Sequence, residues 1–250
     1  MTRAVGAAVM MMLGGACLRL VIGGGYVDYV KEVMYLPLLA SGVILFGLGL
    51  VGLLRETAPG VVGGHVGHGH GHGEPRVAWL LLVPVLAVYL VPPPALGADS
   101  IDRGGSRVTE PISPYGPLPD GDVVELTMRE FVERSVYDTT NALEGRTVRL
   151  TGFAVPAGEE AQGGPSAEDV PVGDGDAAFT LARVSMFCCA ADGYAFTTDI
   201  SGTDEQPPPD TWVTVTGQMV PFEGEVDVYS VPTLEVESLE YIERPANVYE

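Results

Sequence analysis

Residues 33–54 read VMYLPLLASGVILFGLGLVGLL and contain no charged residue. Residues 77–96 also lack any charge, and residues 4–22 are apolar except for Arg19. Each stretch is close to the length of about 20 residues that a helix needs to cross the hydrocarbon core of a bilayer. The sequence therefore predicts three transmembrane helices within residues 1–96.

The rest of the chain is acidic and soluble in character. Residues 97–250 hold 29 of the 33 Asp and Glu residues but only 8 of the 13 Lys and Arg residues, a net charge of −21 against +1 for residues 1–96. A domain of this charge repels the phosphate backbone, which excludes nucleic acid as a partner, and an anionic lipid surface would also hold it away. We expect a protein anchored in the lipid bilayer by its first third, with an acidic soluble domain.

The few basic residues at the ends of the apolar stretches set the expected orientation. Arg3 precedes the first stretch, and Arg55 and Arg76 bracket the loop at 55–76, while the loop at 23–32 has no excess of basic residues. Under the positive-inside rule, the N-terminus and the 55–76 loop are cytoplasmic. The sequence thus predicts a multi-pass protein of the cell membrane with an extracytoplasmic C-terminal domain.

The first apolar stretch, residues 4–22, has an alternative interpretation as a cleaved signal peptide. Cys17 follows Leu13-Gly14-Gly15-Ala16, which is similar to a lipidation signal, but the Leu lies one position too far from the Cys. Two further apolar stretches also follow. A retained helix is favoured, with Cys17 as a small packing residue.

The soluble part begins with residues 97–125, whose Pro and Gly content predicts a linker. Thr127 and Glu130 have the spacing of a capping box, in which Glu130 reaches back to the start of a helix predicted at 128–141. Asp192-Gly193 between two β-rich runs indicates a hairpin. The expected strands cover residues 147–155, 178–188, 194–200, 211–220 and 233–241.

About five strands and one helix within residues 126–250 are typical of a small, partly open β-barrel of OB type. Gly152 and Gly217 fall inside strands, where such a barrel must bend. An open sandwich is the alternative. The predicted fold is a membrane-anchored α+β protein, with three transmembrane helices followed by a small OB-like domain with one helix.

Cys188 and Cys189 are the most distinctive local feature of the outer domain. They are compatible with thiolate ligands for Zn or another soft transition metal, with a vicinal disulfide, or with a redox couple. Two buried packing residues are the structural alternative. Because no His lies in residues 97–250, a tetrahedral metal site would need Asp192, other carboxylates, a second chain or a partner protein.

All four histidines of the chain lie in the predicted cytoplasmic loop at 55–76, at His65, His68, His70 and His72. Neutral imidazole is a ligand for Zn, Ni or Cu, and the Gly residues between the histidines allow a loop to wrap an ion. The alternative is a low-complexity spacer between two helices. The clustering of every His favours a metal-binding loop.

No set of catalytic residues is recognisable in the sequence. It contains neither a phosphate-binding Gly-Lys-Ser/Thr loop nor a Gly-x-Ser-x-Gly elbow. A nucleophile–His pair is excluded from the outer domain, which has no His. The sequence therefore predicts a protein that is not an enzyme.

The layout resembles the YcgQ-like membrane proteins, which are described as candidate permease subunits. The resemblance runs from Tyr35-Leu36-Pro37-Leu38 through the His-rich loop and Trp79-Leu80-Leu81-Leu82-Val83-Pro84 into a soluble domain of uncharacterised type. Its most specific part is Arg183 followed by Cys188-Cys189-Ala190-Ala191-Asp192, similar to the Arg…Cys-Cys-x-x-Asp signature of that domain. The resemblance implies a multi-span permease as partner, metal-related substrates, and Arg183, Cys188, Cys189 and Asp192 as site residues.

Three functions are compatible with these features. The first is a non-enzymatic accessory subunit of a membrane permease, whose outer domain binds cargo or docks on the permease. The second is a membrane-tethered thiol–disulfide redox protein that uses Cys188 and Cys189. The third is a structural or adhesion module, in which the cysteine pair has no function of its own.

Overall fold

The computed structural model describes residues 3–57, 83, 86–87, 90–91, 94–104, 115–156, 177–222, 224 and 226–250. The chain divides into two compact units, Met1–Ala95 and Leu96–Glu250. The His-rich loop at 55–76 lies almost entirely outside the described residues, and so does most of the stretch 77–96.

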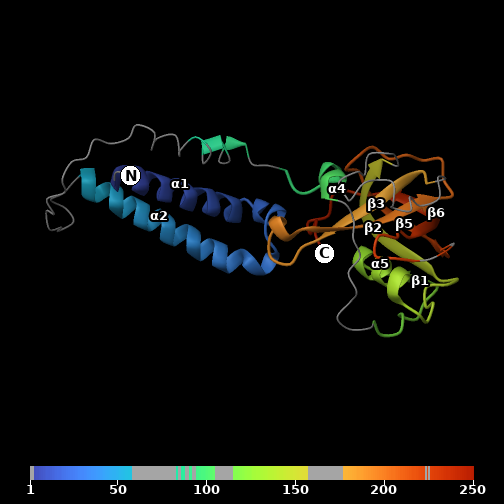
Figure 1. Ribbon diagram of the computed structural model, residues 1–250. Helices are drawn as coiled ribbons and strands as arrows, with labels where there is room; N and C mark the ends of the chain where they lie inside the picture. Colours follow the sequence, from blue (N-terminus) through green and yellow to red (C-terminus); the bar gives the residue numbers. More distant parts are fainter. Residues whose placement is uncertain are drawn as a thin grey trace. The chain divides into compact units, whose positions relative to one another are not determined.

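The first unit contains two long helices, α1 (Arg3–Ile22) and α2 (Tyr35–Thr57), joined by the short 3-10 helices η1 (Gly25–Asp28) and η2 (Glu32–Met34). Figure 1 shows α1 and α2 running side by side as a hairpin. Both are long and apolar enough to cross a bilayer, over Ala4–Ile22 and Glu32–Glu56. Two of the three predicted apolar helices are therefore observed. The third is not confirmed.

Small residues line the contact between α1 and α2. Gly14 and Gly49 are both buried. A Cβ at Gly14 would lie within 3 Å of the backbone of Phe46, and one at Gly49 within 3 Å of the backbone of Met11. Helices in membranes associate through such small residues because lipid supplies no hydrophobic driving force between them. Large apolar side chains point outward instead, as at Leu36, Val43, Ile44, Leu48 and Leu50.

We expect Gly49→Leu to separate α1 from α2, whereas Gly47→Leu leaves them paired, because no atom lies within 4 Å of a Cβ at Gly47. A Gly42→Cys substitution reports on the pairing, since its Cβ would lie 3.2 Å from the Cβ of Cys17. We expect these two cysteines to form a disulfide, measured by mass after alkylation in a chain lacking Cys188 and Cys189. Gly49→Leu should lower its yield severalfold; equal yields with Gly47→Leu would contradict the observed packing.

The second unit is built on one mixed sheet of six strands. The strands are β1 (Val123–Glu125), β2 (Thr147–Pro156), β3 (Phe179–Ser185), β4 (Tyr194–Ser201), β5 (Trp212–Val220) and β6 (Thr233–Tyr241). Strand β2 pairs antiparallel with β5 from Thr147 to Phe153, and with β3 from Phe153 to Pro156. The pairings then continue from β3 to β4, β6 and β5, while β1 lies parallel to β2. The five predicted strands are thus observed, together with the additional short strand β1.

Two glycines lie inside strands, at points where the pairing of the sheet changes or the neighbouring backbone comes close. Gly152 lies immediately before the residue at which β2 changes partner, and a Cβ there would lie 2.5 Å from the carbonyl oxygen of Ala182. Gly217 lies at a register shift between β5 and β6, where a Cβ would overlap the carbonyl of Glu235. A residue with a side chain would therefore push neighbouring strands apart at either position.

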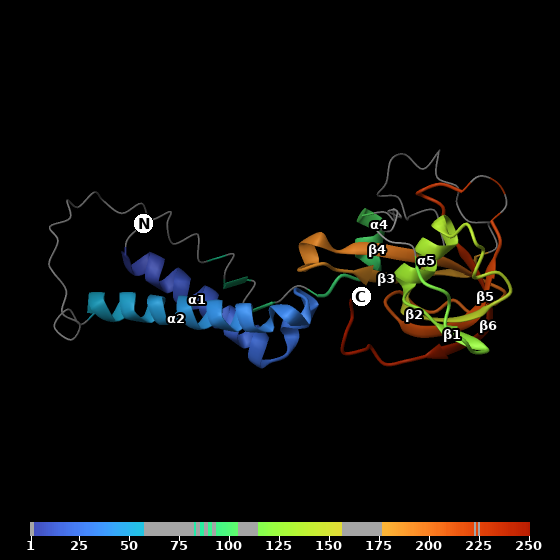
Figure 2. The same cartoon turned by 90° about the horizontal axis from the view of Figure 1, so that it is seen from below.

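Helix α5 (Met128–Tyr137) packs against β2, β3 and β4 (Figure 2) and places Met128, Phe131 and Val132 in the core. It ends four residues earlier than the predicted helix at 128–141. The reason is local: Asp138 has an extended backbone, and its carboxylate accepts hydrogen bonds from the N–H and hydroxyl of Thr140. Such Asp side chains compete with the helix for backbone partners.

The N-terminus of α5 has half of the expected capping box. The hydroxyl of Thr127 accepts a hydrogen bond from the N–H of Glu130, as predicted. The carboxylate of Glu130 does not reach back, because it accepts hydrogen bonds from Arg134 one turn later. A charged donor at this position is a stronger partner than a backbone N–H.

The segment expected to be a linker, residues 97–125, contacts the sheet unit in its described parts. Helix α4 (Ala98–Gly104) packs against β2 and β4, and the N–H of Ala98 donates to the Asp210 carboxylate at 2.7 Å. The hydroxyl of Tyr115 donates to the carboxylate of Glu133, and β1 joins the sheet. Pro and Gly content alone did not indicate these contacts.

Candidate functional site

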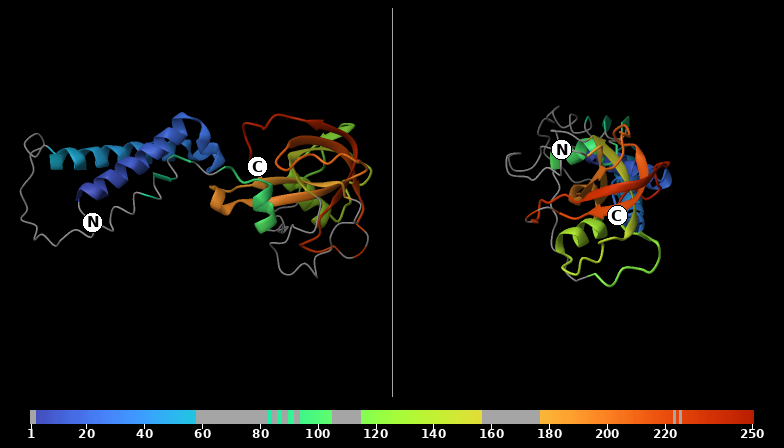
Figure 3. Two further views of the ribbon diagram at one scale, coloured as in Figure 1. Left: turned by 90° about the horizontal axis from the view of Figure 1, so that it is seen from above. Right: turned by 90° about the vertical axis from the view of Figure 1, so that its right-hand side faces the viewer.

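Cys188, Cys189 and Asp192 lie together at the tip of the β3–β4 hairpin, which extends beyond the other strands (Figure 3). Strand β3 ends at Ser185, three residues before the predicted end at Cys188. The chain then turns through the 3-10 helix η4 (Ala190–Asp192) into β4. Because both cysteines lie in this turn, the alternation of side chains along a strand does not separate them.

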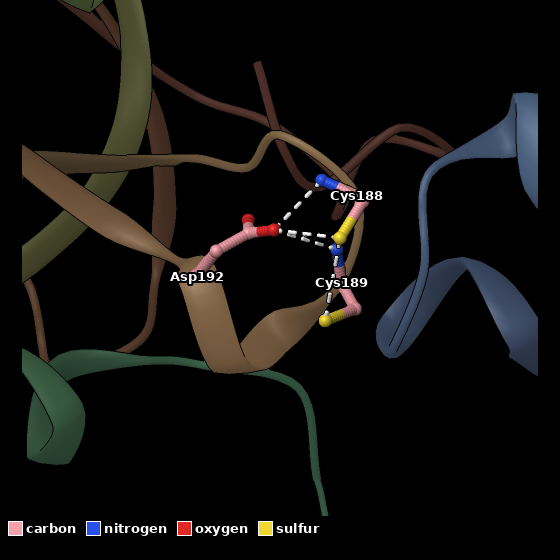
Figure 4. A group of neighbouring side chains, drawn as sticks. All are labelled: Cys188, Cys189 and Asp192. Carbon is pink, nitrogen blue, oxygen red and sulfur yellow. Dashed lines mark hydrogen bonds between the residues drawn. The ribbon is translucent and has the colours of Figure 1, made fainter.

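The Asp192 carboxylate organises the turn (Figure 4). One oxygen, Oδ1, accepts a hydrogen bond from the N–H of Phe187 at 2.7 Å. The other, Oδ2, accepts from the N–H of Cys188 at 2.9 Å and from that of Cys189 at 3.2 Å. A carboxylate that binds three consecutive N–H groups fixes the backbone around both cysteines.

The two thiols are free and close to each other. The Cys188 thiol donates to Asp192 Oδ2 at 2.9 Å, and its Sγ lies 3.7 Å from Sγ of Cys189. Cys188 is exposed and Cys189 is half-buried. One ligand atom from each cysteine and from Asp192 lie within 4.8 Å of one another, which makes them a candidate site for a metal ion.

The hydrogen bond between the Cys188 thiol and the Asp192 carboxylate shifts the pKa of both groups. The Asp192 carboxylate, with a smaller contribution from Cys189, raises the pKa of the Cys188 thiol to about 12. The thiol and then the N–H of Phe187 lower the pKa of Asp192 to about 2. At neutral pH the site therefore holds a protonated Cys188 thiol and an ionised Asp192 carboxylate.

Arg183 is buried on β3 and contacts the C-terminal segment of the chain. Its guanidinium donates to the carbonyl of Asn247 at 2.8 Å and lies 4.7 Å from the centre of the Trp212 ring. Its Nε is 3.9 Å from the carboxylate of Glu250. Burial lowers the pKa of the guanidinium, and Glu250 opposes that shift. The role of Arg183 as a site residue thus stays a prediction, because these contacts hold the fold.

The C-terminal segment was not singled out by the sequence, although it supports the hairpin that carries the thiols. Glu250 pairs by its backbone with Val184 and Met186 of the β3 arm. Its side chain accepts hydrogen bonds from the N–H groups of Met128 and Arg129 at the start of α5. Glu250 therefore connects the part of β3 next to the hairpin tip to the start of the helix.

The other predicted metal ligands, His65, His68, His70 and His72, lie outside the described residues, and their role stays a prediction. The remaining cysteine, Cys17, lies in α1. Among the residues that the structure describes, Cys188, Cys189 and Asp192 are the one group with the arrangement of a metal site.

Comparison with known proteins gives one family. Residues 168–250 match the model of the DUF1980 C-terminal domain, a stretch that contains Arg183, Cys188, Cys189 and Asp192. This part of the sheet unit is therefore similar to that domain. Comparison with curated proteins gives no match, and comparison with solved structures gives none.

Proposed function

We propose that this protein is a non-enzymatic accessory subunit of a membrane permease, and that its outer domain binds a transition metal ion at Cys188, Cys189 and Asp192. The observation that carries the proposal is the distance of 3.7 Å between the two Sγ atoms. Zn–S bonds of about 2.3 Å in a tetrahedral site place two sulfur ligands about 3.8 Å apart. The turn thus holds both sulfurs at a separation that one metal ion requires.

Asp192 fits the same site as a third ligand. Its Oδ2 is 2.9 Å from Sγ of Cys188, a hydrogen-bond distance that is shorter than the roughly 3.6 Å between sulfur and oxygen ligands of one tetrahedral ion. Metal binding removes the thiol proton, which releases this hydrogen bond and lets the two groups move apart. For Cys188 and Asp192 the required adjustment is below 1 Å, which an exposed turn can accommodate.

Three ligands leave one coordination position open, and this supports a role in transfer. Closed four-ligand sites hold structural metal ions, whereas sites with three protein ligands keep a position for an exchangeable group. Two thiolates favour soft or borderline ions such as Cu(I) or Zn. The partner permease, or the cargo that it moves, would supply the fourth ligand.

The membrane setting follows from the sequence expectations. We infer that the stretch 77–96 is a third transmembrane helix, that residues 97–250 face the outside, and that the five-strand circuit of β2 to β6 is the small OB-type barrel predicted from the sequence. The YcgQ-like resemblance is the support for a multi-span permease as partner. The cytoplasmic His loop would bind metal on the opposite side of the membrane.

A thiol–disulfide redox role is the second candidate, since both thiols are free and adjacent. The protonated state of Cys188 is unfavourable for a redox role. Reactive cysteines have a lowered pKa, produced by positive neighbours, because the thiolate is the nucleophile. Here a carboxylate raises the pKa of Cys188 instead. A metal ion overcomes that shift by its own charge, whereas a disulfide-exchange partner does not.

Metal analysis of the full-length protein, purified from gently solubilised membranes, tests the proposal. In a background without the four histidines, we expect about one Zn or Cu ion per chain. Cys188→Ser/Cys189→Ser should lose it and Cys17→Ser should keep it. We also expect a multi-span membrane protein to co-purify with the wild type. Equal metal content in both cysteine variants, or no such partner, would refute the corresponding half of the proposal.

A further inference from the structure

We propose that the tip of the β3–β4 hairpin, residues 186–193, lies at the surface of the bilayer, with Phe187 inserted among the lipid headgroups. The inference rests on the membrane anchor of the proposed function and is independent of metal binding. It assigns an interaction surface to the outer domain, with the bilayer interface as the partner.

The chain enters the sheet unit next to the hairpin tip. Leu96 is the first residue of that unit, and its N–H donates to the hydroxyl of Tyr249 at 3.0 Å. The Leu96 side chain packs beneath the hairpin tip, where a Cβ on Gly193 would lie 2.5 Å from its Cδ1. Gly193 directly follows Asp192, so the chain reaches the outer domain beside the thiol site.

Only a short length of chain separates the helix-compatible part of the third apolar stretch from Leu96. The third apolar stretch, residues 77–96, contains Pro92-Pro93-Pro94 near its end, and a helix cannot continue through them. From Val91 to Leu96 the chain spans five residues, which reach at most about 17 Å when fully extended. The headgroup layer on each side of a bilayer is roughly 7 Å thick. Leu96, which packs beneath the tip, therefore lies within about 10 Å of the headgroups even with the connection fully stretched.

The tip is poor in charged residues and carries an exposed aromatic side chain. Phe187 is 86% exposed, more than any other large apolar side chain among the described residues. Residues 184–198 contain a single charged residue, Asp192, although residues 97–250 contain 37 in 154 positions, a density that would give three or four. Three backbone N–H groups surround the Asp192 charge. The tip thus has few charged residues for so acidic a domain, and it presents an exposed aromatic side chain where the domain approaches lipid.

This arrangement has a consequence for the thiol site. Exposed aromatic side chains anchor proteins at the membrane–water boundary because the ring is stable at the level of the lipid headgroups. With Phe187 anchored, Cys188 and Cys189 face the layer in which the outer mouth of a neighbouring permease opens. An ion leaving or entering that mouth would meet the thiols without crossing the bulk solvent.

Tryptophan quenching tests the position of the tip. The full-length chain carrying Phe187→Trp is reconstituted into phosphatidylcholine vesicles with brominated acyl chains, and the emission of the native Trp79 and Trp212 is subtracted. We expect the added emission to fall at least twofold relative to vesicles without bromine. The matched control is Val226→Trp, also on an exposed site, in the loop between β5 and β6. That loop leads into β6, which pairs with β4 at Asp199–Ser201, the end of the hairpin remote from the tip.

Each outcome has one meaning. Stronger quenching of Phe187→Trp than of Val226→Trp supports docking of the tip on the bilayer. Equal quenching overturns it and leaves the tip to a protein partner or a second copy. Metal content measured on the same samples separates the two proposals: metal without selective quenching refutes only the docking, and selective quenching without metal refutes only the metal site.

Discussion

Replacing Asp192 by Asn is expected to raise the rate at which iodoacetamide alkylates Cys188 at pH 8 by at least tenfold. The carboxylate holds the pKa of this thiol at about 12, against an ordinary value of 9.0. Full release of that shift would increase the thiolate about a thousandfold, since each unit of pKa is a factor of ten. Water screens the carboxylate at this exposed tip, so we expect a smaller but still large effect. Asn keeps a carbonyl oxygen for the N–H groups of the turn.

The measurement uses a Cys189→Ser background, so that one thiol reacts at the tip, and mass spectrometry of the peptide that contains Cys188. Asp227→Asn is the matched control, because Asp227 also accepts a backbone N–H in an exposed loop, that of Tyr229, between β5 and β6. It should leave the rate unchanged. An unchanged rate in Asp192→Asn would show that the thiol does not donate to the carboxylate. The argument against a redox role for Cys188 would then no longer hold.

The same hydrogen bond sets a pH window for the order of the tip. The folded pKa of Asp192 is lowered from 3.8 to about 2, so its contribution is complete above about pH 4 and is lost as the pH falls toward 2. The folded pKa of Cys188 is raised, so its contribution is complete below about pH 9 and is lost as the pH rises toward 12. The turn is therefore most ordered between about pH 4 and pH 9.

Local patterns predicted the strands well because strand propensity and alternation are short-range signals. Apolar and polar residues alternate in the sequence of β5 from Val213 to Thr216, and β6 has the predicted bounds of 233–241. The end of β3 was less predictable. The sequence favours a strand up to Cys188, but Asp192 binds the N–H groups that would otherwise continue the ladder. The sequence singled out Cys188, Cys189 and Asp192, which the structure brings together, but it did not indicate that Asp192 organises the turn.

Contacts between distant parts of the chain left no signal in the sequence. Glu250 meets Met128 and Arg129 across more than 120 positions, and nothing in its neighbourhood forms a motif. The segment at 97–125 was predicted as a linker from its Pro and Gly content, yet Ala98 binds Asp210, which is 112 positions away. Such pairings depend on the assembled sheet, so periodicity and composition cannot indicate them.

Arg183→Ala is expected to lower the free energy of unfolding of the sheet unit by about 3 kcal/mol, because it removes one partner of a buried ion pair. Arg183 is 8% exposed, donates to the Asn247 carbonyl and stacks on Trp212, so its loss also opens a cavity beside the ring. Urea unfolding of the full-length chain, followed by Trp fluorescence, measures the change. Arg149→Ala is the matched control, an exposed Arg on β2 whose loss should cost less than about 0.5 kcal/mol.

Glu250→Gln separates the charge of the ion pair from its hydrogen bonds. Burial raises the pKa of Glu250 above 4.5, so its charged form is disfavoured in the folded state and stability falls as the pH rises through this range. A neutral Gln still accepts the N–H of Met128 and avoids that desolvation, so we expect a loss below about 1 kcal/mol. Arg183 would then stabilise this end of β3 mainly through Asn247 and Trp212. If Arg183→Ala unfolds no more easily than Arg149→Ala, Arg183 is not a structural residue. The ligand or partner role implied by the resemblance then becomes the better explanation of its position five residues before Cys188.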